Sequence, residues 1–417
     1  MLAHKGVWLL GALLLVAVIA LAYIQTQQRS PLTTTNEPHS IVTNFKEDAK
    51  STRSFTWYTN SSNSATLLQI VKGTSRAANF DEQDILRFTG TTTTIKTGDK
   101  SIQGVHKVNA TGLEPGTRYT YRVGTGKGTD WSEPAEFVTE AANTTDFTFI
   151  NVADSQGISK QDFEVWGQTL SKAFHTFPEA NFIVHNGDLV EDPEVEQSWD
   201  YFFGYAKKWL TSYPLMPVTG NHDEVEGNAA RFVSHFNLPD NAAKGSTPGT
   251  NYSFDYGTAH FVFLNTESNK KKQKEWLLED LSGTKQPWII VALHQGPYGG
   301  KQEDSIIKQW VPLFDQFKVD LVLQGHNHEY SRSYPLKDGQ ITTQENGTVY
   351  VVTNTSGNKF NDKKADLFYH QVHFQNKKQM YSGIRINGDT LTYEAYDFDD
   401  VMLDNFVLQK PSVQNTM

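Results

Sequence analysis

The sequence predicts a multidomain protein in which an all-β sandwich precedes an α/β layered domain. The chain has 417 residues, which is more than one ordinary domain uses. Between residues 38 and 142, short β-rich runs are separated by turn residues, and we find no convincing amphipathic helix. From residue 145 to residue 410, apolar strands alternate with segments of helical periodicity, which is typical of an α/β layered fold.

The composition limits the chemistry of the chain. It is 38% hydrophobic and 20% charged, as in globular proteins, and its net charge of −10 argues against a broad surface for nucleic acid. A phosphate substrate would need local positive charge, such as metal ions. Because the sequence contains no cysteine, it forms no disulfide, and any metal must be bound by His, Asp, Glu, Asn or Gln.

The first element is an apolar run at residues 7–24 that carries no charge and is just long enough to span a bilayer. Lys5 precedes it, and the A-L-A at residues 20–22 fits a signal-peptidase site. We favour an uncleaved signal anchor over a cleaved signal peptide. A buried core helix fits poorly, because a polar linker at residues 25–37 follows directly. We therefore expect an exported protein that is anchored at the cell surface or secreted, with the membrane as a partner in the first case.

The first folded domain, residues 38–142, is predicted from six β-rich runs, at 54–59, 65–73, 91–98, 104–110, 118–124 and 135–140. Trp57 alternates with Phe55 and is a candidate for the core. The pattern L-x-P-G-T-x-Y, which ends at Tyr119, resembles the tyrosine corner of fibronectin type III and immunoglobulin-like sandwiches. These features indicate a fibronectin type III-like domain.

The second domain, residues 145–410, is predicted from seven apolar runs, at 147–154, 181–188, 215–223, 260–267, 288–294, 319–328 and 348–354. Residues 160–177 and 270–281 keep the apolar spacing of helices, and the lysine run in the second is interpreted as a solvated face. Residues 411–417 are a tail. The histidines outside motifs, among them His175 and His260, are interpreted as structural residues with no role in the site.

Five of these strands end in side chains that bind metals: Asp154 and Gln156; Asp188; Asn221, His222 and Asp223; His294; and His326 and His328. Ligands gather at the carboxyl ends of strands in open α/β sheets, so we expect these side chains to lie together. Oxygen and imidazole donors suit Zn, Fe or Mn. Two neighbouring ions would clamp a phosphoryl group and activate a water molecule.

The ordered motifs D-x-Q, G-D, G-N-H-D, A-L-H and G-H-x-H resemble those of the calcineurin-like metallophosphoesterases. The segment "GLEPGTRYTYRVG" and the later "EYSRSYPL", "GTVYVV" and "LDNFVL" resemble purple acid phosphatases. The resemblance covers residues 38–410. It implies a metal-dependent phosphoric ester hydrolase of the acid-phosphatase type, with two metal ions and a phosphate ester substrate.

The resemblance also implies roles for single residues. The ligands of the first metal would be Asp154, Asp188 and His328, and those of the second would be Asp188, Asn221, His294 and His326. Asp188 would bridge the two ions. His222 would lie beside the substrate and stabilise the phosphate or protonate the leaving oxygen, and Asp223 could orient its ring.

Two positions depart from the family pattern. Many metallophosphoesterases have His and purple acid phosphatases have Gly where this chain has Gln156, whose amide oxygen could bind the first metal; the alternative is a turn residue that faces solvent. Purple acid phosphatases carry a metal-binding Tyr where this chain has Glu191. The metal pair is therefore left open among Fe, Mn and Zn.

The function that we predict is a phosphomonoesterase in which a metal-bound hydroxide attacks phosphorus. One alternative is a phosphodiesterase or nucleotidase that uses the same site. The other is a cell-surface binding protein in which the sandwich domain binds the partner and the catalytic domain is vestigial. The complete set of metal ligands argues against this second alternative. The sequence leaves the oligomeric state open.

Overall fold

The computed structural model describes residues 37–61, 64–73, 80, 84–98, 102–126 and 130–411. The apolar run at residues 7–24 and all of the predicted linker except Glu37 lie outside these ranges. Among the helices in the described part of the chain, none is both long and apolar enough to cross a bilayer.

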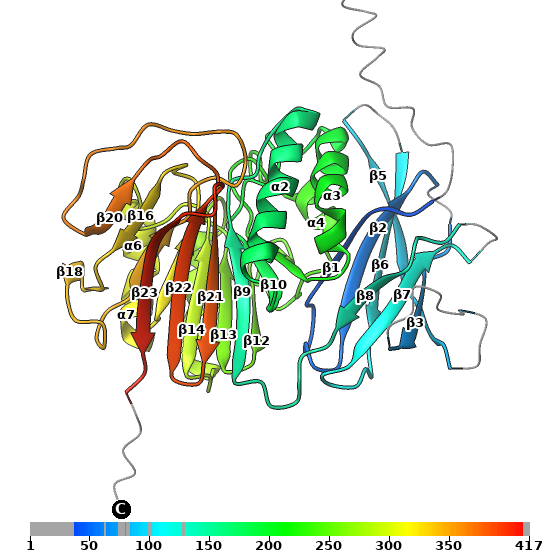
Figure 1. The fold of residues 1–417 in the computed structure, drawn as a ribbon, viewed down its shortest axis with the longest axis horizontal. Coiled ribbons are helices and arrows are strands. Elements are labelled where there is room, and N and C mark those ends of the chain that lie inside the picture. Colours follow the sequence, from blue (N-terminus) through cyan, green and yellow to red (C-terminus); the bar gives the residue numbers. More distant parts are fainter. Residues whose placement is uncertain are drawn as a thin grey trace, which may run out of the picture. The chain divides into compact units, whose positions relative to one another are not determined.

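The first domain is the predicted all-β sandwich, made of two four-stranded sheets (Figure 1). One sheet has the order β1 (His39–Asn44), β2 (Arg53–Thr59), β6 (Ile102–Ala110) and β5 (Thr91–Lys96). The other has the order β4 (Leu86–Thr89), β3 (Leu67–Lys72), β7 (Arg118–Gly124) and β8 (Ala135–Val138). Strands β1 and β4 were not predicted. Trp57 is fully buried, and the tyrosine corner is present, because the Glu114 backbone N–H donates to the Tyr119 hydroxyl at 2.9 Å.

The second domain has two large sheets and a small one made of β17 (Leu336–Lys337) and β18 (Gln340–Ile341). The six-stranded sheet has the order β11 (Leu215–Pro217), β10 (Ala180–His185), β9 (Asp146–Val152), β21 (Met380–Asn387), β22 (Thr390–Asp397) and β23 (Met402–Gln409). The seven-stranded sheet has the order β12 (Tyr252–Tyr256), β13 (Ala259–Leu264), β14 (Trp288–Leu293), β15 (Leu321–Gln324), β19 (Val349–Val352), β16 (Tyr330–Ser333) and β20 (His370–Phe374). All seven predicted strands are present, and they divide between the two sheets.

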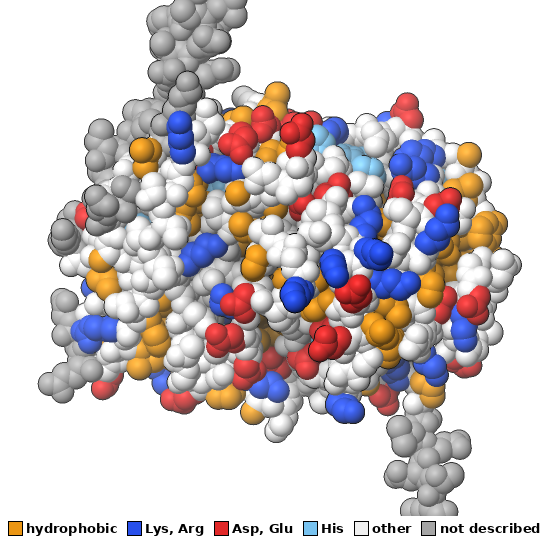
Figure 2. Space-filling view, turned by 180° about the vertical axis from the view of Figure 1, so that it is seen from behind, with side chains coloured by type: hydrophobic (Ala, Val, Ile, Leu, Met, Phe, Trp, Pro, Cys, Tyr) orange, Lys and Arg blue, Asp and Glu red, His pale blue; other side chains and the backbone are white. Residues whose placement is uncertain are grey.

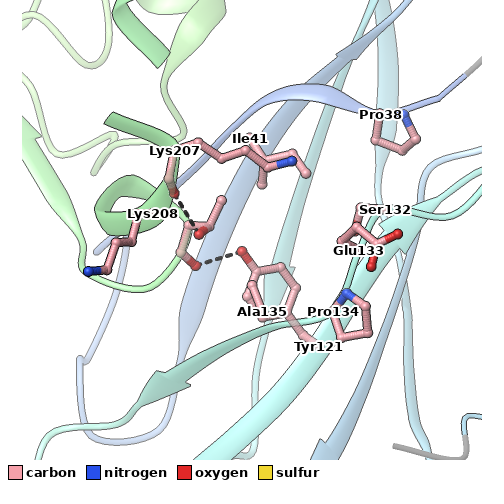
Figure 3. A pocket seen from close by; sticks show the side chains of 10 residues that line it. Pro38, Ile41, Tyr121, Ser132, Glu133, Pro134, Ala135, Lys207 and Lys208 are labelled. Atoms are coloured by element: carbon pink, nitrogen blue, oxygen red, sulfur yellow. Dashed lines mark hydrogen bonds between the residues drawn. The ribbon is translucent and has the colours of Figure 1, made fainter. Parts of the chain in front are cut away.

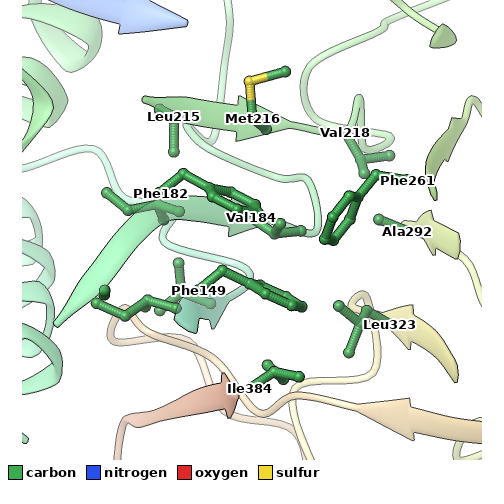
Figure 4. Packing of buried hydrophobic residues seen from close by; sticks show 14 of the residues in the cluster. Phe149, Phe182, Val184, Leu215, Met216, Val218, Phe261, Ala292, Leu323 and Ile384 are labelled. Carbon is green, nitrogen blue, oxygen red and sulfur yellow. The ribbon is translucent and has the colours of Figure 1, made fainter. Parts of the chain in front are cut away.

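The main core lies between these sheets. Figure 4 shows Phe149, Phe182 and Ile384 of the six-stranded sheet facing Phe261 and Leu323 of the seven-stranded sheet. These strands are buried on both faces, because helices cover the outer sides of the sheets. Strands buried in this way have nearly continuous apolar sequences. The covering helices are α2 (Lys160–Thr176) and α3 (Glu196–Leu210) on one side and α5 (Lys270–Gly283), α6 (Asp304–Gln309) and α7 (Val311–Phe317) on the other.

Helix α2 begins at Lys160, because the preceding residue, Ser159, caps its N-terminus. Ser159 accepts a hydrogen bond from the Asp162 backbone N–H, and the Asp162 carboxylate accepts one from the Ser159 backbone N–H. This capping box satisfies two N–H groups that a helix start leaves free. It fixes the end of the loop that carries Asp154 and Gln156.

The sandwich and the second domain share apolar packing and buried hydrogen bonds. Phe45, next to β1, packs in the core of the α/β domain. The Lys107 ammonium on β6 donates to the carbonyl oxygens of Val233 and Phe236 at 2.5 and 2.6 Å. At the same boundary, the Tyr121 hydroxyl donates to the Thr211 carbonyl at 2.7 Å beside a cavity of about 320 Å³ (Figure 3).

His260, the second residue of β13, makes a contribution to stability that can be tested. Its ring lies between Asp255, at 2.7 Å, and Asp280, at 2.8 Å. Burial disfavours the charged ring, but the two carboxylates outweigh burial and raise its pKa to about 9. Because the folded pKa lies above the unfolded value near 6.5, this stabilisation is complete below pH 6.5 and is lost as the pH rises through 9.

We therefore expect His260→Gln to lower the free energy of unfolding by about 1–3 kcal/mol at pH 6 and by less at pH 10. Urea unfolding at both pH values measures this. His175→Gln, which changes an exposed histidine of α2, is the control and should have little effect at either pH. Equal destabilisation by His260→Gln at both pH values would contradict the charged pair.

Candidate metal centre

The predicted site residues converge where parallel strands end. Asp154, Asp188 and Asn221 follow β9, β10 and β11, which are parallel neighbours in one sheet. His294 follows β14, and His326 and His328 follow β15, its parallel neighbour in the other sheet. On the face that Figure 2 shows, acidic and basic side chains are interspersed and histidine side chains (pale blue) gather near the upper edge.

One group of ligand atoms is formed by Asp188, His294 and His326, which each offer one atom within 4.8 Å of the others. The His294 Nε2 lies 3.1 Å from an Asp188 carboxylate oxygen. The Asn221 side-chain oxygen joins them, at 3.1 Å from His294 Nε2 and 3.0 Å from His326 Nδ1. Four ligand atoms thus lie close to one another, as they would around a bound cation.

A second group is formed by Asp154, Asp188 and His328, again with one atom each within 4.8 Å. The His328 Nε2 lies 3.5 Å from an Asp154 carboxylate oxygen. All three side chains are buried. Asp188 belongs to both groups, so its two oxygens can serve two neighbouring ions.

Backbone carbonyl groups fix the orientation of two histidines. The Asn186 carbonyl oxygen lies 2.8 Å from His294 Nδ1, and the Lys359 carbonyl oxygen lies 2.6 Å from His328 Nδ1. Because a carbonyl only accepts, each Nδ1 carries the proton and each Nε2 keeps its lone pair for a metal. Sequence reasoning missed both supports, since any residue type can supply a carbonyl from a distant part of the chain.

The backbone at the ligands is unusual. Asp154, Asp188, His326 and His328 all have φ between 50° and 72°, a left-handed conformation that is rare for residues other than glycine. Such strain concentrates at functional sites. The glycine of the G-N-H-D motif is needed for a steric reason, because a Cβ on Gly220 would lie 2.1 Å from an Asp188 side-chain oxygen.

Buried charges dominate the electrostatics of the site. Burial raises the pKa of Asp154. Burial also opposes the charge on Asp188, but His294 outweighs it and holds that pKa below its usual range. Conversely, the Asp188 and Asp154 carboxylates overcome the burial of His294 and raise its pKa to about 10. In the absence of a metal, these carboxylates favour a second proton on His294, at Nε2. A bound cation would replace that proton and leave the Nε2 lone pair as its ligand.

Gln156 lies inside the site and not at the surface. Its side chain is 2% exposed, and neither its oxygen nor its nitrogen has a hydrogen-bond partner. Its backbone N–H donates to the Asp188 carbonyl at 3.1 Å, which places it beside the two ligand groups. The alternative of a turn residue that faces solvent is therefore wrong. An unpaired buried amide is costly, so its oxygen suits a cation.

The structure corrects the role expected for Asp223. Its carboxylate accepts from the backbone N–H groups of Asp188, Leu189 and Gly220 at 2.7, 3.0 and 2.9 Å. It therefore holds two loops together and is not the group that orients His222. Burial, followed by the charge of Asp188, raises the pKa of Asp223 to about 8.

His222 is instead oriented by the residue that replaces the family tyrosine. The Glu191 backbone carbonyl lies 2.8 Å from His222 Nδ1, so Nδ1 carries a proton and Nε2 can accept a hydrogen bond. The Glu191 carboxylate accepts from the Lys359 ammonium at 3.1 and 3.2 Å. That ammonium also lies 3.4 Å from His222 Nε2. Lys359 could not be identified from the sequence, because it follows β19 in a loop without a motif.

A third group with metal-binding side chains, Asp366, His370 and His373, lies outside the strand-end site. His370 Nδ1 accepts from the Leu367 N–H at 3.1 Å, and its Nε2 lies 3.0 Å from the Gly299 carbonyl. Both nitrogens of His370 are thus used within the fold. We assign this group to the structure of β20 and of the loop before it.

Two sequence families match the chain. "Calcineurin-like phosphoesterase" matches residues 147–330, and "Purple acid Phosphatase, N-terminal domain" matches residues 38–139. The fold is similar to that of a purple acid phosphatase from yellow lupin (Lupinus luteus) seeds, with a TM-score of 0.77 and 18% sequence identity. That alignment covers 90% of this chain and 75% of the lupin chain.

Two curated relatives show how far the sequence similarity extends. An uncharacterized protein of Mycobacterium tuberculosis is 27% identical in an alignment 202 residues long, which covers 41% of this chain and 38% of that protein. Purple acid phosphatase 15 of Arabidopsis thaliana is 26% identical in an alignment 294 residues long, which covers 61% of this chain and 54% of that protein. The chain thus matches less than two thirds of the length of each relative.

Proposed function

Because residues 147–330 belong to the calcineurin-like phosphoesterases and residues 38–139 to the N-terminal domains of purple acid phosphatases, we propose that this chain is a dinuclear metal-dependent phosphomonoesterase. One observation carries the proposal. Two groups of ligand atoms share the buried Asp188, and His222 lies next to them. A carboxylate shared by two neighbouring ligand groups can hold two ions close together, as two-metal hydrolysis needs.

The residues of the chain act around the substrate as follows. Asp154, Asp188 and His328 would hold one ion, and Asp188, Asn221, His294 and His326 would hold the other. Such ions would supply Lewis-acid polarisation of the phosphoryl oxygens and an activated water as the nucleophile. The His222 Nδ1 proton is bonded to the Glu191 carbonyl, so His222 acts as a general acid only when its ring carries a second proton, on Nε2; that proton would pass to the leaving oxygen.

The test is a screen of the full chain loaded with Mn, Zn or Fe. Its arms are p-nitrophenyl phosphate, bis-p-nitrophenyl phosphate and nucleoside monophosphates, and metal content is measured on the same samples. We expect two ions per chain and fastest turnover of the monoester. Preference for the diester or for nucleotides would favour the alternative hydrolases. Failure to retain stoichiometric metal would favour a vestigial site.

Gln156 is a further ligand of the first ion in this proposal. We expect Gln156→Leu to weaken binding of one metal by at least about tenfold, measured by competition with a chromophoric chelator. Gln273→Leu is the control, because Gln273 is equally buried but hydrogen-bonded outside the site. If Gln156 binds no metal, Gln156→Leu would leave the affinity unchanged and stabilise the protein, since it removes an unsatisfied amide.

The proposal also includes export. The apolar run at residues 7–24 supports it, and fractionation of cells that express the full chain tests it. We expect the protein outside the cytoplasmic fraction, in the membrane pellet if the run is an anchor and in the medium or periplasm if it is cleaved. A chain that lacks residues 1–24 should stay in the cytoplasm. Full-length protein in the cytoplasm would contradict export.

A further inference from the structure

The segment at residues 353–361, between β19 and β20, lies against the ligand group formed by Asp154, Asp188 and His328. The Ser356 N–H donates to the Ala153 carbonyl at 2.8 Å, and the Asn361 side chain donates to the Asn327 carbonyl at 2.9 Å. Gly357 approaches Ser155 so closely that a Cβ would lie 3.0 Å from its backbone. The segment is therefore fixed against the loops that carry Asp154 and His328.

Both the backbone and the side chain of Lys359 make contacts at the site. Its carbonyl oxygen orients His328, and its ammonium lies between the Glu191 carboxylate and His222 Nε2. The Lys359 side chain is 44% exposed and that of Glu191 is 35% exposed, so their ion pair is a partly solvated one. Such pairs are weak and exchange readily, because water screens them. The ammonium can thus leave Glu191 for another anion at the same place.

Binding of a phosphate ester would bring an anion next to the Lys359 ammonium. In the proposed function, on which this inference rests, His222 faces the phosphate ester. A cation 3.4 Å from His222 Nε2 then lies within reach of the oxygens of the same phosphate. A phosphate monoester carries nearly two negative charges at neutral pH and a diester carries one, so an added cation favours the monoester.

We propose that Lys359 is a specificity-determining residue, which binds a non-bridging oxygen of the substrate phosphate and selects monoesters over diesters, and that Glu191 holds the ammonium in place before the substrate binds. Glu191 is then a positioning residue and not a metal ligand. The chemistry that Lys359 recognises is a dianionic phosphate, whether in an ester or as the free inorganic ion.

The test uses the full chain loaded with metal, and Lys359→Met, Lys359→Arg and Glu191→Gln. In each Lys359 variant the backbone carbonyl that orients His328 remains, so metal content should equal that of the wild type. For Lys359→Met we expect the KM of p-nitrophenyl phosphate and the Kd of inorganic phosphate, from calorimetry, to rise about 10–100-fold. The KM of bis-p-nitrophenyl phosphate should change little. Lys359→Arg should restore most of the phosphate affinity.

Lys363→Met is the matched control, because Lys363 follows the same segment and its ammonium pairs with Asp366 at 2.5 Å. It should leave both constants unchanged. Glu191→Gln should retain both metals and bind phosphate at least as tightly as the wild type. Loss of a metal in Glu191→Gln would overturn its positioning role. An unchanged phosphate Kd in Lys359→Met, or equal losses with both esters, would overturn the role of Lys359.

The outcome is distinguishable from failure of the proposed function. If no ester is hydrolysed by the wild type but Lys359→Met still weakens phosphate binding, the proposed function fails and the recognition role of Lys359 stands. If Lys359→Met hydrolyses the monoester with wild-type KM, the role of Lys359 fails and the proposed function stands.

Discussion

Asp188→Ala is expected to lose both metal ions and to lower phosphomonoesterase turnover by more than about 10³-fold. The reason is that the Asp188 carboxylate belongs to both groups of ligand atoms, so its removal opens each site at once. His294→Ala removes a ligand of one group only, so we expect it to release mainly one ion. Metal content by mass spectrometry, together with kcat/KM for p-nitrophenyl phosphate, measures both effects.

Asp192→Ala is the control for this prediction, because Asp192 is exposed and follows in the same loop. It should keep both ions and near-wild-type activity. The overall fold of Asp188→Ala is checked by circular dichroism, since loss of a folded chain would also lose metal. A folded Asp188→Ala variant with two ions and normal turnover would rule out the shared carboxylate.

The second large effect is expected from His222→Ala. The variant should keep both metals, because it is the His222 backbone N–H, not its ring, that donates to Asp188 at 2.8 Å. It should slow turnover of an alkyl phosphate by about 10²–10⁴-fold, the usual contribution of general acid catalysis. An aryl phosphate should lose less, because its leaving oxygen needs less help from a proton.

The comparison of the two substrates decides the role of His222. If alkyl and aryl phosphates lose rate equally, His222 binds the phosphate and does not donate a proton. His175→Ala changes an exposed histidine of α2 and should affect neither substrate. Metal content measured on the same samples separates a slower reaction from a lost ion.

Much of the fold could be predicted because buried parallel strands and amphipathic helices leave strong periodic signals. The helix expected at residues 160–177 is α2, which ends one residue earlier. What could not be predicted is the division of the seven strands between two sheets. That division depends on β21, which follows most of the domain in sequence yet pairs with β9. Pairing between such distant segments leaves no local pattern.

The candidate site shows the same limit. The motif residues at the strand ends could be identified because carboxyl ends of neighbouring parallel strands meet. The partners of their side chains could not. Asp223 lies next to His222 in sequence but bonds to backbone N–H groups, while the His222 ring is held by Glu191 from another loop. Lys359 joins the site from a segment whose position depends on the complete tertiary structure.

The pairing of β9 with β21 also sets when the site can form during synthesis. Asn151 of β9 pairs with Ser382, more than two hundred residues later in the chain. At translation rates of about 5–20 residues per second, β9 therefore waits roughly 10–50 s for its neighbour. During this time its apolar edge is open to wrong partners, and chaperones that shield strand edges should matter more for this chain than for one with local pairing.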